Sequence, residues 1–232
     1  MSPFDPDHPQ SAAPDGTLTG FDVDVATEIG QRLGLRVELV ALAPNDLFGQ
    51  TGRWDIGLPS TPAWSVDGAA FLSTSAYYAW PHLLLVPAGS GATSVDDVQG
   101  QPICAVAGDA GQAWLIGRYG PASPGVASTP PIPSTLILRA SDAECLAALE
   151  AGRVRAVVTA SMTPAAAAAL PDAVTIDGPA PEPRVAVIGR AGDGSASLLE
   201  AFSGAIGAMR ADGTLAGLSQ ARFGSDLTPA AP

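Results

Sequence analysis

The stretch that decides the fold reads Gly20-Phe21-Asp22-Val23-Asp24-Val25-Ala26. From Phe21 onward, apolar residues recur at every fourth position, continuing through Val25, Ile29 and Leu33. This spacing places one apolar stripe along a helix, and Gly34 predicts where that helix ends. The stretch therefore predicts an amphipathic helix that buries one face against the rest of the chain.

Short apolar runs follow this helix and alternate with further helical patterns. Strands are expected at residues 36–42, 55–58, 82–86, 103–107, 135–138, 154–159, 173–176 and 185–188. The pattern restarts near Gly89, and helices are expected between most of these strands and after the last one. Because strands alternate with helices, the sequence predicts an α/β fold with mainly parallel sheets covered on both faces.

Several helix boundaries carry local signals. Ser94 to Asp97 predicts a helix start, and Ser141 with Glu144 has the spacing of a capping box. Gly152 predicts the end of the helix that Ser141 begins. Gly108 and Gly111 lie on either side of the expected start of a helix that carries Trp114.

Composition narrows the functional classes. The chain has 232 residues, of which 47% are hydrophobic and 15% charged, so it can build a substantial core. Its net charge of −12 disfavours binding to nucleic acid or to anionic membrane surfaces. None of its 11 basic residues is a lysine, which excludes Schiff-base and lysine general-base chemistry. No apolar run approaches the roughly 18 residues needed to cross a bilayer.

A series of short motifs, in order, resembles one family. Gly20 to Ala26 is similar to the "GFDVDLA" signature of the amino-acid-binding solute-binding proteins, and further landmarks keep the family's order and spacing. They are Gly52-Arg53-Trp54-Asp55 for "GKYD", Ser60-Thr61-Pro62 for "T-x-T-P", Tyr77-Tyr78 for "PYY", residues 94–100 for "SLEDLKG", residues 152–157 for "GRVDAV" and residues 211–215 for "ADGTL".

The resemblance implies a type 2 periplasmic-binding-protein fold. Such a fold has two α/β lobes, each a mainly parallel sheet flanked by helices, joined by two crossover strands. The implied lobes are residues 1–87 plus 188–232 and residues 88–187. Ligand would bind in the cleft between them, and the lobes would close by hinge motion. The family normally has a buried strand before its Pro-Phe pair, whereas this sequence begins at that pair, Pro3-Phe4.

The two cysteines allow two interpretations. Cys104 falls on an expected strand and Cys145 on an expected helix, and both could be buried free thiols. The resemblance instead implies a disulfide, because the positions are similar to those of the disulfide-bearing glutamate- and glutamine-binding branch of ABC importers. A disulfide persists in an oxidising compartment. We therefore expect an extracytoplasmic protein, although no signal segment is visible before Ser2-Pro3-Phe4.

The resemblance also identifies the ligand contacts, and most are replaced. The arginine that grips a ligand carboxylate aligns with Trp64, and the threonine that assists it aligns with Pro59. The lobe-two threonine aligns with Asp109, the ammonium-binding aspartate with Ala160, and the aspartate of "GRVDAV" with Arg155. The expected ligand contacts are Asn45, Ser60, Thr61, Trp64, Asp109, Ala110 and Ala160.

These replacements disfavour a standard amino acid as the ligand. Losing a charge-assisted bidentate partner typically costs about 2–5 kcal/mol of binding free energy. One interpretation is a site for a neutral or cationic solute, with Trp64 as a stacking wall and Asp109 as the charged contact. In the alternative, purely structural interpretation, Asp109 only caps a helix and Trp64 only packs between the lobes. A further alternative is a non-transport sensor or scaffold module on the same fold.

Catalytic and metal-binding motifs are not recognisable. No Cys or His spacing typical of a metal site is present, nor is a nucleophile elbow, a P-loop or a dinucleotide fingerprint. We expect no cofactor, no metal and no catalytic residue, and an enzyme on this scaffold is the third hypothesis. The expected partners are a small-molecule ligand and an ABC transporter permease, with the protein itself a monomer.

Overall fold

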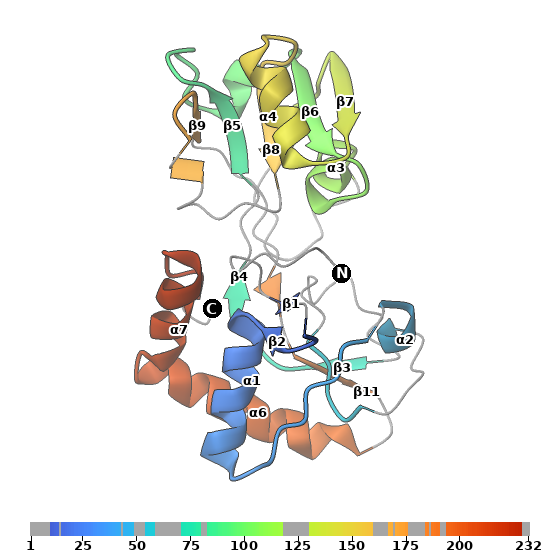
Figure 1. Ribbon diagram of the computed structural model, residues 1–232, viewed down its shortest axis with the longest axis vertical. Helices are drawn as coiled ribbons and strands as arrows, with labels where there is room; N and C mark the ends of the chain where they lie inside the picture. Colours follow the sequence, from blue (N-terminus) through green and yellow to red (C-terminus); the bar gives the residue numbers. More distant parts are fainter. Residues whose placement is uncertain are drawn as a thin grey trace. The chain divides into compact units, whose positions relative to one another are not determined.

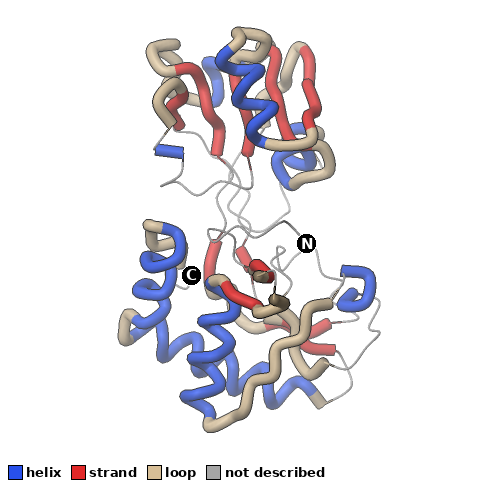
Figure 2. The backbone as a smooth tube through the Cα atoms, viewed as in Figure 1, coloured by secondary structure: helices blue, strands red, loops and turns tan. Residues whose placement is uncertain are grey.

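The computed structural model forms two compact units, one of residues 1–79 and 184–232 and the other of residues 80–183 (Figure 1). The structure describes residues 10–13, 15–42, 44–48, 54–58, 71–79, 83–117, 130–159, 167–168, 170–175, 184–185, 187–190 and 194–228. Within these residues strands and helices both occur in each unit (Figure 2). The expected α/β class is confirmed.

The second unit is built on a five-stranded sheet of order β7-β6-β8-β5-β9. Strand β6 pairs in parallel with β7 and β8, whereas β5 pairs antiparallel with β8 and β9. Four strands therefore run in one direction and β5 runs against them. The strands are β5 (Leu83–Pro87), β6 (Pro102–Val106), β7 (Thr135–Arg139), β8 (Ala156–Thr159) and β9 (Ala173–Thr175).

Both faces of this sheet are buried, because alternate side chains of a strand point to opposite faces. Leu85, Cys104 and Val157 pack on the side of helix α4 (Asp142–Glu150). The neighbouring residues along the same strands form a second apolar cluster with helix α3 (Ala110–Leu115) and the 3-10 helix η2 (Val95–Val98), and its members include Val86, Ile103, Ala105, Trp114 and Val158.

The first unit contains the predicted long helix, α1 (Phe21–Leu33), which ends with Gly34 in the left-handed conformation. Helices α6 (Ser195–Ala211) and α7 (Thr214–Phe223) contact it, and a short helix α2 spans Pro44–Phe48. The described strand pairs are antiparallel. They are β1 (Ser11–Ala12) with β2 (Leu18–Thr19), β3 (Phe71–Ser73) with β11 (Ile188–Arg190), and β4 (Tyr78–Ala79) with β10 (Arg184–Val185).

Two expected strands of the first unit are wrong as strands. Residues 36–42 form no regular structure, and residues 55–58 contribute only an isolated bridge from Gly57 to Ile188. The 36–42 run has the composition of a strand, but a strand also needs a neighbour to complete its ladder, and none of the described strands pairs with it. The sequence pattern shows that a segment has the composition of a strand, but it does not show whether a partner strand is present.

The start of α1 carries a buried carboxylate that joins separate parts of the first unit. Asp22 is only 1% exposed. Its Oδ1 accepts a hydrogen bond of 2.6 Å from the hydroxyl of Tyr77, and its Oδ2 accepts one of 2.7 Å from the side-chain amide of Gln10. The amide of Gln10 also donates to the carbonyl of Leu58. Asp22 lies in the first turn of α1, where a negatively charged side chain interacts favourably with the helix dipole.

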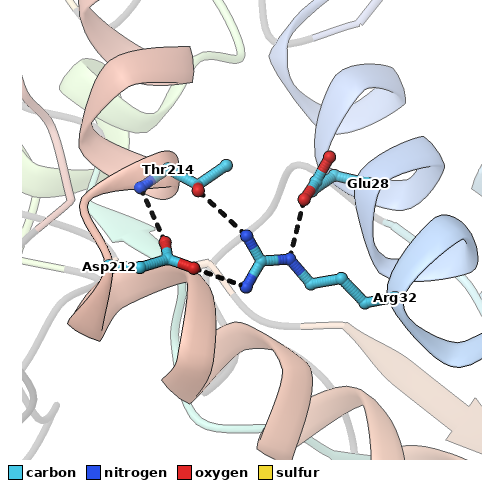
Figure 3. A network of polar contacts seen from close by, with 4 residues as sticks. All are labelled: Glu28, Arg32, Asp212 and Thr214. Atoms are coloured by element: carbon cyan, nitrogen blue, oxygen red, sulfur yellow. Dashed lines mark hydrogen bonds and ion pairs between the residues drawn. The ribbon is translucent and has the colours of Figure 1, made fainter.

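Polar contacts also fix α1 against the two C-terminal helices. Arg32 donates to Glu28 one turn earlier, at 2.7 Å, to Asp212 at the end of α6, at 2.8 Å, and to Thr214, the first residue of α7, at 2.9 Å (Figure 3). The bond from Arg32 lowers the pKa of Asp212 to about 2. Arg222 of α7 binds both carboxylate oxygens of Asp24. Asp24 of the "GFDVDVA" stretch therefore binds α7, and Asp212 and Thr214 of the "ADGTL" stretch bind α1.

The expected disulfide between Cys104 and Cys145 is present. It joins β6 to α4, and both cysteines are fully buried. It closes a loop across a sequence separation of 41 residues, which corresponds to about 4 kcal/mol in the chain-entropy description of the unfolded state. The bridge thus reinforces the packing of α4 on the sheet.

Replacing Asp22 by Ala should lower the free energy of unfolding by about 3 kcal/mol, because the buried hydroxyl of Tyr77 loses its acceptor. Urea denaturation would measure this loss. The matched control is Asp96→Ala at an exposed position, where we expect a change within about 0.5 kcal/mol. Equal effects of the two substitutions would contradict a structural role for the Asp22 network.

Reducing the disulfide should lower the melting temperature measured by circular dichroism, because the unfolded chain regains the freedom that the bridge removes. The double variant Cys104→Ala, Cys145→Ala should melt at a similarly lower temperature and should no longer respond to reductant. An oxidised protein whose melting point does not change in reductant would argue against any stabilising role for the bridge.

Candidate functional site

The candidate site lies at the carboxyl ends of β6, β7 and β8 in the second unit. Parallel neighbours end at the same edge of a sheet, and ligands of open α/β sheets bind outside that edge. Asp109 follows β6, Asp142 follows β7, and the buried Thr159 ends β8. The topology thus brings together polar residues that are up to 50 positions apart in the sequence.

Asp109 is the N-cap residue of helix α3 and directly precedes its first residue. Its Oδ1 accepts a hydrogen bond of 2.7 Å from the backbone N–H of Gln112. The side chain of Gln112 reaches back and accepts a bond of 2.6 Å from the backbone N–H of Gly108. Asp109 therefore has the helix-capping role that the purely structural interpretation predicts.

Gly108 and Gly111, on either side of Asp109, are each required to be glycine for a different structural reason. Gly108 has a φ of 81°, in the left-handed region that favours glycine. Gly111 lies against β8, where an added Cβ would come within 2.8 Å of the Cγ1 atom of Val158. Helix α3 therefore packs closely on β8 because position 111 has no side chain, and this close packing fixes Asp109 over the strand ends.

The cap engages only one of the two carboxylate oxygens of Asp109. Oδ2 is buried and makes no hydrogen bond among the described residues, and the same holds for Oδ1 of Asp142. The pKa of Asp109 is raised to about 6, mainly by burial and to a smaller extent by the nearby charge of Asp142, while hydrogen bonds from the backbone of Gln112 and Gly111 oppose the rise. Two acidic groups thus face one edge of the sheet with acceptor capacity left over, which favours a ligand that donates hydrogen bonds or carries positive charge.

The other expected contacts are covered less fully. Ser60, Thr61, Trp64 and Ala160 lie outside the described residues. Asn45 belongs to helix α2 of the first unit, and Ala110 is the first residue of α3, directly after Asp109. Of the expected contacts in the second unit, the structure thus places Asp109 and Ala110 together at the strand ends.

Sequence reasoning missed Asp142 and Gln112. Asp142 stands between Ser141 and Glu144, which were recognised only as helix-capping residues. Ser141 does cap α4, since its Oγ accepts from the backbone N–H of Glu144 at 3.3 Å. The available signal was the position of Asp142 just after β7, a strand parallel to the one that precedes Asp109.

Comparison with solved structures supports the fold. A substrate-binding domain of a putative amino acid ABC transporter from Streptococcus pneumoniae has 18% identity and a TM-score of 0.70, with 96% of each chain covered. The L-cystine solute receptor of Neisseria gonorrhoeae has 22% identity and a TM-score of 0.69, covering 96% of this chain and 90% of that one. A histidine kinase sensor domain with similarity to periplasmic binding proteins has 21% identity and a TM-score of 0.63, covering 95% and 92%.

These likenesses confirm the type 2 periplasmic-binding-protein fold. Residues 4–225 match the bacterial extracellular solute-binding proteins, family 3, and the chain belongs to that family. A search of curated protein sequences gives no match. Among the described residues, no helix is long and apolar enough to span a bilayer.

The unfolding free energy should rise as the pH falls from 7 to 5, because folded Asp109 binds a proton near pH 6 whereas the unfolded carboxyl does so near its ordinary value of 3.8. Solvent screening of this partly exposed group limits the effect to about 1 kcal/mol. Urea denaturation at the two pH values would measure it.

The variant Asp109→Asn keeps a cap acceptor and removes the titration, so its stability should change less between pH 7 and 5 than that of the wild type. The control Asp172→Asn, at an exposed position of the same unit, should retain the wild-type pH dependence. Parallel pH profiles for wild type and Asp109→Asn would rule out Asp109 as the source.

Proposed function

We propose that this protein is the extracytoplasmic solute-binding component of an ABC-type importer, and that it binds a small polar molecule other than a standard amino acid. Family membership supports the binding role. The disulfide supports a periplasmic, secreted or lipid-anchored protein, because such bridges persist in oxidising compartments. The proposed partners are a small-molecule ligand and a permease, with the protein acting as a monomer and without catalysis.

The observation that carries the ligand proposal is that Oδ2 of Asp109 is buried and accepts no hydrogen bond from the described residues. Family resemblance places a threonine at this position, where a hydroxyl would donate to a ligand carboxylate. Asp109 offers a buried acceptor instead, and Asp142 adds a second one nearby. An anionic ligand group would be repelled here, whereas an ammonium, a guanidinium or a neutral donor would satisfy both oxygens.

The proposed replacement of the remaining family contacts points the same way. Trp64 in place of the carboxylate-binding arginine offers an aromatic face, and such faces attract cations. With Ala160 in place of the ammonium-binding aspartate, the acidic contacts proposed for this unit are Asp109 and the neighbouring Asp142. A cationic or neutral solute fits this combination of residues better than a zwitterionic amino acid does.

A sensor module is the second candidate. The similarity to a histidine kinase sensor domain favours it, since that domain shares the fold over 95% of this chain. A sensor would also bind a solute, so the two candidates differ in their protein partner. Co-purification with a permease would favour the importer component.

A thermal-shift screen tests the ligand class. The panel contains the standard amino acids, polyamines, quaternary amines, sugars and nucleosides. A ligand at a hundred times its dissociation constant should stabilise the protein by about 2.7 kcal/mol. A hit among cations or neutral solutes supports the proposal, whereas a hit with glutamate or glutamine contradicts it.

For a cationic hit, Asp109→Asn should weaken binding at least about tenfold in isothermal titration calorimetry, because a charge-assisted hydrogen bond is lost. The exposed variant Asp172→Asn should bind as the wild type does. Unchanged affinity in Asp109→Asn would remove Asp109 from the binding site.

A further inference from the structure

A polar cavity that is open to solvent lies on the second unit, at the amino ends of β6 and β8, and its lining residues Asp97 and Arg155 are exposed. It has a volume of about 260 Å³ and is lined by residues that include Ser90, Gly91, Asp97, Gln101 and Arg155. Ligand pockets typically measure about 300–1,000 Å³, so this volume suits only a small solute. Asp109 lies at the carboxyl ends of the same strands, so the cavity is separate from the candidate site above.

The strand order explains why a hollow forms here. Strand β8 lies between β5 and β6, and Arg155 directly precedes it. The backbone N–H of Arg155 donates to the carbonyl of Pro102 at 2.8 Å, which fixes Arg155 beside the start of β6. The chain between β5 and β6 turns back through Ser90 and η2 over these strand ends. The lining residues therefore come from two separate stretches of the chain.

Asp97 supplies a fixed negative charge. Its Oδ2 accepts bonds from the backbone N–H groups of Thr93 and Ser94, both at 2.9 Å, and from their hydroxyl groups. These bonds lower the pKa of Asp97, so it stays ionised at neutral pH. All four bonds end on Oδ2, and Oδ1 accepts no hydrogen bond from the part of the chain that the structure describes.

Arg155 supplies the positive charge. In the ranges that the structure describes, no carboxylate forms an ion pair with its guanidinium. The side chain of Gln101 likewise makes no hydrogen bond with the described residues. The cavity thus combines a guanidinium, a carboxylate and an amide, each with hydrogen-bonding capacity that this part of the protein does not use.

We propose that this cavity binds a small zwitterion, with its carboxylate on Arg155 and its ammonium group on Oδ1 of Asp97. Arg155 can hold a carboxylate with two parallel hydrogen bonds. A dianion such as phosphate is disfavoured by Asp97 and by the net charge of −12. A simple cation is disfavoured by Arg155. A molecule that carries both charges pairs with both residues.

The test is a titration followed by ¹H–¹⁵N NMR, which reports each site separately. The probe is 4-aminobutanoate, with butanoate and butylammonium at equal ionic strength as single-charge controls. We expect saturable shifts of the amides of Gly91, Ala92 and Gln101 with 4-aminobutanoate, and at least about tenfold weaker responses with either control. Equal responses to all three probes, or no shift with 4-aminobutanoate, would overturn the proposal.

Two neighbouring arginines provide matched variants. Arg155→Gln should weaken the response to 4-aminobutanoate at least about tenfold, because the bidentate carboxylate partner is lost. Arg153→Gln removes an equal charge two residues away, at an exposed position outside the cavity lining, and should leave the response unchanged. Equal affinities of Arg155→Gln and wild type would exclude Arg155 as the carboxylate partner.

Asp109→Asn should leave these amide shifts intact, which separates this cavity from the site at the opposite edge of the sheet. The dispersion of the ¹H–¹⁵N spectrum verifies that each variant is folded. Loss of the shifts in Asp109→Asn would assign them to the other site and overturn the proposal.

Discussion

The first unit depends on the buried carboxylate of Asp22. A charge that is 1% exposed is stable only when its oxygens are paired, and here the partners come from Gln10 and Tyr77. Because Gln10 also bonds the carbonyl of Leu58, the single carboxylate organises three segments that are distant in the sequence. The aromatic rings of Phe21 and Tyr77 stack beside it, so the same short stretch supplies both the polar and the apolar centre.

The second unit instead separates its core from its polar groups. Apolar strands buried on both faces leave only the strand ends for polar chemistry. Asp109 and Asp142 occupy the carboxyl ends, and Arg155 and Asp97 the amino ends. The carboxyl edge is acidic, whereas the amino edge carries both signs of charge. Each edge therefore suits a different class of small molecule, although both rest on the same strands.

Sequence reasoning located most helices and the strands of the second unit, because their periodicity is set by local packing. Helix α1 starts and ends where the spacing of Phe21 and the glycine at 34 predict. The sequence-based prediction of a strand was wrong at residues 36–42, where the composition favours a strand but no described strand supplies a partner. The sequence analysis predicted Asp109 at the candidate site and missed Asp142, because only the parallel pairing of β6 with β7 brings Asp142 close to Asp109.

The sequence by itself determined the family, the α/β class and the cysteines that form the bridge, since ordered motifs and local periodicity carry this information. Only the tertiary structure decided which polar groups meet and which remain unpaired. Whether Oδ2 of Asp109 or the guanidinium of Arg155 finds a partner depends on residues from other strands and helices. Hydrogen bonding and burial are properties of those non-local neighbours, and residue order alone does not contain them.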